Sequence, residues 1–158
     1  ASLIADLAEQ LHFTFPKLSP KQKRKLKSAL GDLVHLSNPL DYQTYVWNDQ
    51  VKLTMAFKSM MEETYDFLFI IMDLPKQSRC SSDAWYPAIA ALKEAKKIAK
   101  CPVGLITSLE ENMPEKFAKD LIKHSIIPLT GLENSLAAVK ALQNVSILWK
   151  LKSFPSII

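Results

Sequence analysis

The sequence predicts an open α/β fold, in which helices cover both faces of a parallel sheet. Short, uninterrupted apolar runs, typical of strands buried on both faces, alternate with longer segments whose apolar residues recur every three to four positions. This alternation favours right-handed β-α-β units. The 158 residues are 48% hydrophobic, which is enough to bury one core of ordinary size.

The expected helices share an amphipathic spacing of apolar residues and capping residues at their ends. Ser2, Ser19-Pro20, Asn48-Asp49 and Asp83 precede helical patterns, and Gly31 follows one at a C-cap position. With these caps included, we expect helices over residues 2–11, 19–31, 49–61, 83–99, 114–122 and 132–142.

The expected strands are apolar runs too short to form helices, over residues 33–36, 67–72, 103–106 and 126–127. The run Phe67–Met72 has no polar interruption, so we expect it to be a central strand covered on both faces. Doubly wound domains normally start on a strand, whereas this chain starts on a helical pattern. We therefore expect that the first strand is missing and lies upstream of Ala1, which would make the chain a fragment of a longer protein.

The domain is expected to cover residues 1–145, followed by a C-terminal tail or linker over 146–158. Apolar residues continue into this tail at Trp149, Leu151 and Phe154. They indicate a contact with a sheet edge or with a neighbouring molecule, so a homo-oligomer is one of the expectations.

Composition excludes several common classes of site. The three glycines are too few and too scattered for a Gly-x-Gly-x-x-Gly dinucleotide fingerprint or a P-loop. Two cysteines cannot form a disulfide framework, and the three histidines lack ligand spacing, so no metal site is expected. With neither a bilayer-length apolar run nor a signal-peptide pattern, the chain is expected to be cytoplasmic and not membrane-bound.

The net charge of +4 does not demand nucleic acid as a partner. The densest basic cluster consists of Lys21, Lys23, Arg24, Lys25 and Lys27. We interpret it as the solvated face of a helix and expect no nucleic-acid partner. The alternative is a docking face for an acidic surface or nucleic acid, although no aromatic residues interleave the cluster.

Ligands in open α/β sheets bind beyond the carboxyl ends of the strands. The loops expected there are residues 37–48, 73–83, 107–112 and 130–133, all polar, and the helix N-termini that follow them favour a phosphate or carboxylate. The candidate site residues are Asn38, Asp41, Asp73, Arg79, Thr107, Ser108 and Asn112. Cap or turn roles explain Asp41, Asn112 and Asp73 as an alternative.

Ser37-Asn38-Pro39-Leu40-Asp41, directly after an expected strand, resembles the Asn-Pro-hydrophobic-Asp motif of NDP-forming acyl-CoA synthetases, the relatives of succinyl-CoA synthetase. The similarity is to their flavodoxin-like ligase-CoA domain and covers about residues 1–143. It continues through residues 65–66 and 72–75, 102–103 and 107–108, and 126–129.

The resemblance implies a reaction in which ATP phosphorylates a histidine, the phosphoryl group moves to a carboxylic acid, and CoA displaces the phosphate. It implies that the full enzyme uses CoA and ATP with Mg²⁺, that CoA-binding and ATP-grasp domains are partners, and that this domain binds no cofactor alone. No catalytic residue is expected in this fragment, which would be inactive in isolation. The implied substrate-facing and phosphohistidine-facing residues are Asn38, Pro39 and Asp41 by motif, and Asp73, Arg79, Ser108 and Asn112 by position.

One loop departs from the family's pattern. Pro75, Lys76 and Gln77 stand where the relatives often place glycines, so the substrate contacts are expected to differ. The alternative function is a receiver-like signalling or protein-interaction module without catalytic activity, because Asp73 ends one strand and Thr107-Ser108 ends the next. Against it, Ile127-Pro128 stands where a receiver has its lysine.

Overall fold

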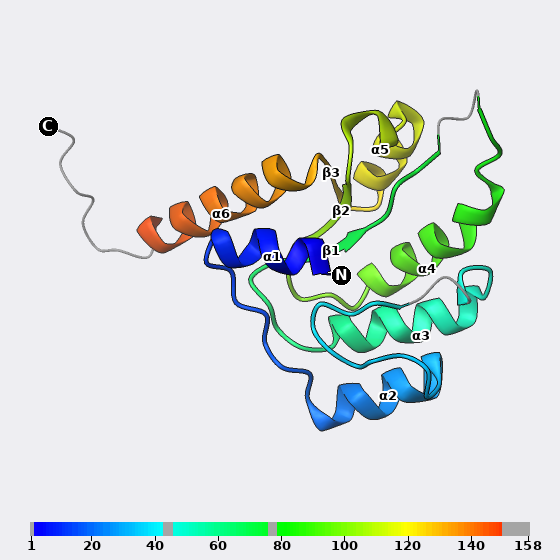
Figure 1. Ribbon diagram of the computed structural model, residues 1–158. Coiled ribbons are helices and arrows are strands. Elements are labelled where there is room, and N and C mark those ends of the chain that lie inside the picture. The colour runs from blue at the N-terminus through cyan, green and yellow to red at the C-terminus, as the bar shows by residue number, and fades with distance from the viewer. Residues whose placement is uncertain (1, 43–45, 76–78, 150–158) are drawn as a thin grey trace, which may run out of the picture.

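The computed structural model describes residues 2–42, 46–75 and 79–149 (Figure 1). Its sheet consists of three parallel strands in the order β1-β2-β3. They are β1 (Leu68–Ile71), β2 (Val103–Thr107) and β3 (Ile127–Thr130). Leu68 pairs with Val103, and Gly104 pairs with Ile127. The predicted α/β class with a parallel sheet is therefore confirmed.

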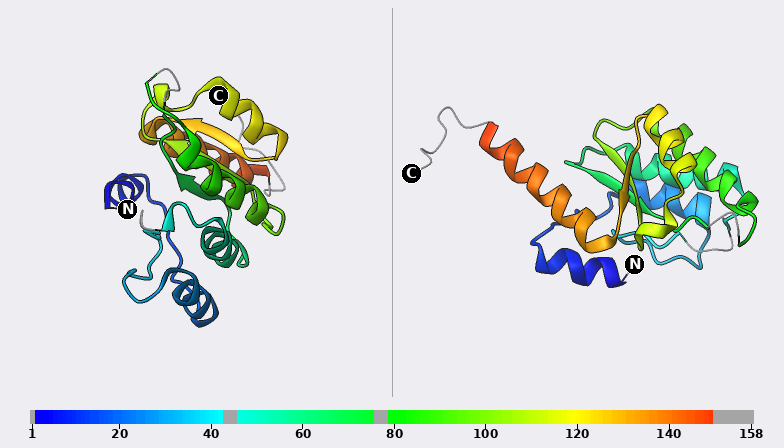
Figure 2. Two further views of the ribbon diagram at one scale, coloured as in Figure 1. Left: turned by 90° about the vertical axis from the view of Figure 1, so that its right-hand side faces the viewer. Right: turned by 90° about the horizontal axis from the view of Figure 1, so that it is seen from above.

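The helices lie on both faces of this sheet. They are α1 (Ser2–Gln10), α2 (Pro20–Leu30), α3 (Gln50–Met61), α4 (Tyr86–Lys96), α5 (Glu115–Lys123) and α6 (Leu132–Trp149), with short 3₁₀ turns η2 (Asp83–Trp85) and η3 (Glu110–Asn112). Helices α1 and α6 pack together on one side of the strands, while α3, α4 and α5 lie on the other (Figures 1 and 2). Helix α2 packs on α3. The arrangement is that of an open sheet with helices on both faces.

The main core lies between the sheet and the α3–α4 layer. All five residues of β2 are buried, and Leu53 of α3, Leu92 of α4 and Leu105 of β2 have no exposed surface. The ring of Phe67 packs directly on Gly104 of β2, where an added Cβ would lie 3.0 Å from the ring. Burial of this apolar layer is the principal stabilising term of the fold.

The predicted helix ends are confirmed where capping residues identified them. Ser19 and Gln22 form a reciprocal capping box at the start of α2, and Gly31 ends that helix with a φ of 78°, which a residue without a Cβ adopts readily. The carboxylate of Asp49 accepts from the Lys52 N–H at the start of α3. The side chain of Ser2, the expected first cap, lies outside what the structure describes.

Two strand predictions are wrong. Residues 33–36 form no strand: Leu33 is 87% exposed, and only Val34 in this segment is buried. Phe67–Met72 contributes only Leu68–Ile71, at an edge of the described sheet, and β2 is the central strand. Within β1 only Ile70 is buried and the other three residues are half-buried, so the run is neither central nor fully covered.

Several boundaries also differ from expectation: β3 covers Ile127–Thr130 rather than residues 126–127, and α4 ends at Lys96 rather than at residue 99. Asp83 begins the 3₁₀ turn η2, and α4 starts only at Tyr86. Helix α6 continues to Trp149, so residues 146–149 belong to the helix, while residues 150–158 of the expected tail lie outside the described residues. Over the described part of the chain, no helix combines the length and the apolar character needed to cross a bilayer.

Candidate functional site

The loops that follow β1 and β2 are joined at the carboxyl edge of the sheet by Asp73. One carboxylate oxygen, Oδ1, accepts from the Ser108 N–H at 2.7 Å, and Oδ2 accepts from the Ser108 Oγ–H at 2.6 Å. The carbonyl of Asn112 accepts from the Leu74 N–H at 3.0 Å. Three residues predicted from the sequence, Asp73, Ser108 and Asn112, are therefore brought together.

The environment of Asp73 favours its charged form. Partial burial alone would raise the pKa of this carboxyl group. Hydrogen bonds from the Ser108 and Asn112 side chains and from the backbone N–H groups of Ser108 and Leu109 outweigh that effect, and the pKa of Asp73 is lowered. Asp73 is therefore an ionised carboxylate that braces two loops.

Thr107 stabilises the loop that follows β2. It ends β2, is completely buried, and its Oγ1–H donates to the Leu109 carbonyl at 2.7 Å. The Thr107 hydroxyl is therefore occupied within its own loop. The hydroxyl that lies beside Asp73 is that of Ser108. Arg79 is exposed in the loop between β1 and η2.

A row of aromatic rings connects this edge to the loop of Asp41. The Trp85 indole N–H donates to the Asp73 carbonyl at 2.7 Å, and its ring meets Trp47 edge-on with centroids 6.1 Å apart. Trp47 in turn stacks on Tyr42, also at 6.1 Å. Tyr42 and Trp47 are not among the site residues predicted from the sequence. The signal that could have identified them is the occurrence of large aromatic rings in an otherwise polar loop, where packing against a core or a ligand is the usual reason.

Burial raises the pKa of Tyr42, and the neighbouring charge of Asp41 adds to the effect. The ring also meets Phe57 edge-on with centroids 5.4 Å apart. Tyr42 is therefore a neutral, packed anchor that holds the loop carrying Asp41 against α3.

The remaining predicted residues, Asn38, Pro39 and Asp41, line a large cavity of about 1340 Å³. The Asn38 amide donates to the Pro16 carbonyl at 3.1 Å, and the Asn38–Pro39 peptide bond is cis. These residues belong to a different loop from Asp73 and Ser108. Tyr42, which follows Asp41 in the chain, links this loop to Asp73 through Trp47 and Trp85.

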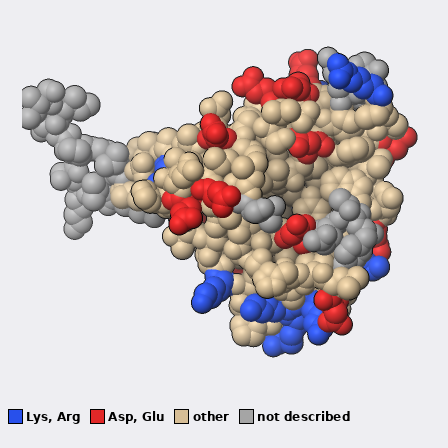
Figure 3. All heavy atoms as spheres, in the orientation of Figure 1, with Lys and Arg blue, Asp and Glu red and all other residues tan. Residues whose placement is uncertain are grey.

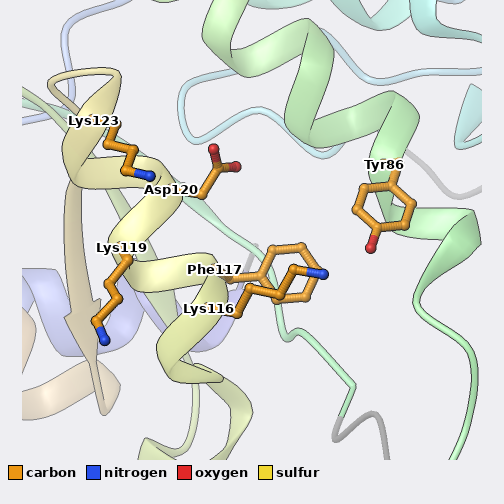
Figure 4. Close-up of a pocket in the computed structure, with 6 residues that line it drawn as sticks. All are labelled: Tyr86, Lys116, Phe117, Lys119, Asp120 and Lys123. Atoms are coloured by element: carbon orange, nitrogen blue, oxygen red, sulfur yellow. The ribbon is translucent and has the colours of Figure 1, made fainter.

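A second, smaller cavity of about 420 Å³ lies between α4 and α5 (Figure 4). Lys116 and Phe117 extend from α5 toward Tyr86, while Lys119 points away from it. Asp120, also at this cavity, pairs with Lys93 of α4. This arrangement joins two helices and leaves the lysines at the surface.

The basic cluster of α2 is largely engaged in ion pairs. Lys and Arg side chains gather over this helix, at the bottom of Figure 3, beside acidic neighbours. Lys21 and Lys25 both pair with Glu62, and Lys27 pairs with Asp32. Within the described ranges, no group of three or more His, Cys, Asp or Glu side chains is placed to hold a metal ion.

No family model matches the chain, and no curated protein matches it.

Proposed function

We propose that this chain is the flavodoxin-like ligase-CoA domain of a cytoplasmic, NDP-forming acyl-CoA synthetase. In this role it contributes loops that face the carboxylic acid substrate and the phosphohistidine, and it supplies no nucleophile. The proposal starts from the similarity of Asn38-Pro39-Leu40-Asp41 to the family's motif. The parallel α/β architecture agrees with it.

The observation that best supports the proposal is the brace between Asp73 and Ser108. It fixes the loops after β1 and β2 relative to each other, at the sheet edge where ligands of open α/β folds bind. Fixed dipoles stabilise a transferring phosphoryl group without reorganising during the reaction. A domain that acts by position and electrostatics needs this rigidity.

The first test is the size and activity of the native protein. An antibody raised against residues 1–158 is used to blot extracts of the source cells and to capture the native enzyme. A band several times larger than 17.8 kDa, or a co-captured ATP-grasp subunit, supports the proposal. A band of this size with no such subunit overturns it. Blotting of fractionated cells tests the cytoplasmic location.

The captured enzyme is then incubated with γ-labelled ATP. The proposal expects a phosphoryl group that is labile in acid and stable in alkali, as phosphohistidine is, and that is discharged when a carboxylic acid is added. Asn38→Ala and Asp41→Ala in the full enzyme should slow the acid-dependent discharge while Lys23→Ala, an exposed control on α2, leaves it unchanged. If both site variants discharge the phosphoryl group at the wild-type rate, Asn38 and Asp41 have no role in the site.

The Asp73–Ser108 contact also supports the alternative, a receiver-like module with Asp73 as phosphoacceptor. Incubation with acetyl phosphate separates the two functions. A receiver would form a hydroxylamine-sensitive acyl phosphate that is abolished in Asp73→Asn. An acyl-CoA synthetase domain would remain unlabelled.

A further inference from the structure

The outer edge of β1 is unpaired within the described sheet. The N–H groups of Leu68 and Met72 donate to the carbonyls of Pro102 and Ile106 on the β2 side, each at 3.0 Å. In a parallel ladder, alternate residues point their backbone groups to opposite neighbours, so Phe69 and Ile71 direct theirs away from β2. A row of free backbone donors and acceptors on an apolar strand is a template for a further strand.

This edge differs from the other edge of the sheet. Strand β3 contains Pro128, which lacks an N–H and so discourages strand addition. Strand β1 reads Leu68-Phe69-Ile70-Ile71, with no proline and no charge. Natural edge strands often carry a proline or a charge, and β1 carries neither.

The free edge of β1 lies in the large cavity described above, whose walls are mostly apolar. On one side, α6 contributes Val139, Leu142 and Trp149, of which Trp149 is 75% exposed. On the other side, α3 contributes Phe57 and Met60. Figure 1 shows β1 between the α1–α6 pair and α3. The cavity volume of about 1340 Å³ exceeds the roughly 300–1,000 Å³ of ordinary small-molecule pockets.

Two loop segments, 13–16 and 38–42, also line the cavity. The bond from the Asn38 amide to the Pro16 carbonyl ties them to each other. A slender extended segment fits among these helices and loops. A second copy of the chain would bring its own helix-covered sheet and would collide with them.

We propose that the cavity beside β1 binds one extended peptide strand, from outside residues 1–158, that hydrogen-bonds to the outer edge of β1 and carries apolar side chains on both faces. Backbone pairing with Phe69 and Ile71 supplies the directional contacts, as in β-strand addition. Apolar side chains on one face of the strand meet α6, and those on the other meet α3. This inference does not depend on the proposed enzymatic function.

The probe for this site is an acetylated and amidated peptide of five alternating valine and isoleucine residues, flanked by lysines for solubility. Amide hydrogen exchange of the 158-residue chain is followed by NMR with and without the peptide. Exchange should slow about tenfold or more at Phe69 and Ile71. It should change little at Leu68 and Ile70, whose amides already point toward β2.

Two controls separate strand pairing from unspecific apolar binding. A peptide N-methylated at all five core residues has no backbone donor on either edge and should fail to protect Phe69 and Ile71. Leu142→Asp, which places a charge in the α6 wall at a side chain 60% exposed, should weaken binding about tenfold, whereas Ile122→Asp on α5, 62% exposed and outside the cavity, should not.

Three outcomes would overturn the proposal. They are the absence of peptide binding to the folded chain, equal protection by the N-methylated peptide, and protection of Phe69 and Ile71 without peptide in a chain that sedimentation shows to be dimeric. The last result would assign the edge to a second copy.

Discussion

Asp73 and Ser108 join the ends of two neighbouring strands through both oxygens of one carboxylate, at 2.7 and 2.6 Å. The two residues are 35 positions apart in the sequence, and only the parallel pairing of β1 and β2 brings them together. Because the serine contributes both its N–H and its hydroxyl, the bond fixes the orientation of the loop as well as its distance.

Replacement of Asp73 by asparagine should destabilise the fold by about 1 kcal/mol at neutral pH, since charge-assisted hydrogen bonds are exchanged for weaker ones and the residue is partly exposed. The pKa of Asp73 is lowered in the folded state, so its contribution is complete above the unfolded value near 3.9 and is lost as the pH falls through the folded value. Urea denaturation of both proteins at neutral and strongly acidic pH measures this.

The difference between wild type and Asp73→Asn should shrink on acidification. A difference that stays constant with pH would show that the carboxylate charge has no part in it. Ser108→Ala, alone and combined with Asp73→Asn, completes a double-mutant cycle, and additive effects would contradict the bond between the two residues.

Gly104→Ala should destabilise the protein by about 1–3 kcal/mol, the range for overpacking a filled core. The added Cβ would lie 3.0 Å from Cε1 and Cζ of Phe67 and 3.4 Å from the Ile127 carbonyl oxygen. Thermal or urea unfolding measures the loss. If steric conflict with the ring is the cause, Phe67→Leu in the Gly104→Ala background should recover part of the stability. A double variant less stable than the sum of the single effects would contradict this cause.

Local chemistry made several elements predictable from the sequence. Ser19, Gly31 and Asp49 marked helix ends because side-chain caps and a left-handed φ are decided by a few neighbouring residues. The parallel sheet followed from alternating apolar runs. The position of Asp73 and Ser108 after neighbouring strands predicted that they would lie near each other, because parallel strands end at one edge.

The features that were not predicted correctly depend on contacts between segments that are distant in the sequence. Residues 33–36 have the composition of a strand, but a strand forms only where another backbone lies alongside, and the sequence does not state whether one does. The packing of Trp47 on Trp85 joins residues 38 positions apart in the chain, and Tyr42 extends this row from five positions before Trp47. No spacing rule predicts such contacts, so the link between the two groups of candidate site residues became visible only in the structure.

Gln22→Met should cost about 2 kcal/mol of stability, although the side chain keeps its size. The Gln22 amide, 1% exposed, donates to the Ser59 carbonyl at 3.1 Å and to the Tyr65 hydroxyl at 2.9 Å, and its oxygen accepts from the Ser19 N–H at 2.9 Å. Methionine can make none of these three hydrogen bonds. Lys23→Met on the adjacent exposed position is the matched control, and equal losses in the two variants would mean that the hydrogen bonds do not hold α2 on α3.

Tyr42→Phe should make the protein less sensitive to alkali. Burial raises the pKa of Tyr42, so the folded state retains the hydroxyl proton where the unfolded state, with a value near 10, has lost it. Its contribution is therefore complete below the unfolded value and is lost as the pH rises above it. Urea denaturation between about pH 8 and pH 11 should show a shallower decline for Tyr42→Phe than for wild type, with Tyr86→Phe, at a tyrosine 43% exposed, as control. Parallel declines in all three proteins would contradict this origin.

Glu62→Gln should have a small effect that depends on salt. Hydrogen bonds from Lys25 and then Lys21 lower the pKa of Glu62, but these lysines are 43% and 61% exposed, so solvent screens both pairs. We expect a loss of about 0.5 kcal/mol at low ionic strength that disappears in about 1 M salt, where charges are screened beyond roughly 3 Å.

The same variant tests the interpretation of the basic cluster on α2. Removal of the Glu62 charge leaves Lys21 and Lys25 without their carboxylate partner while the helix stays in place. If the cluster is a solvated face, neither wild type nor Glu62→Gln should bind a fluorescein-labelled oligonucleotide at physiological salt. Binding by wild type that weakens steeply with salt would instead identify α2 as a nucleic-acid surface, because each phosphate contact releases counterions.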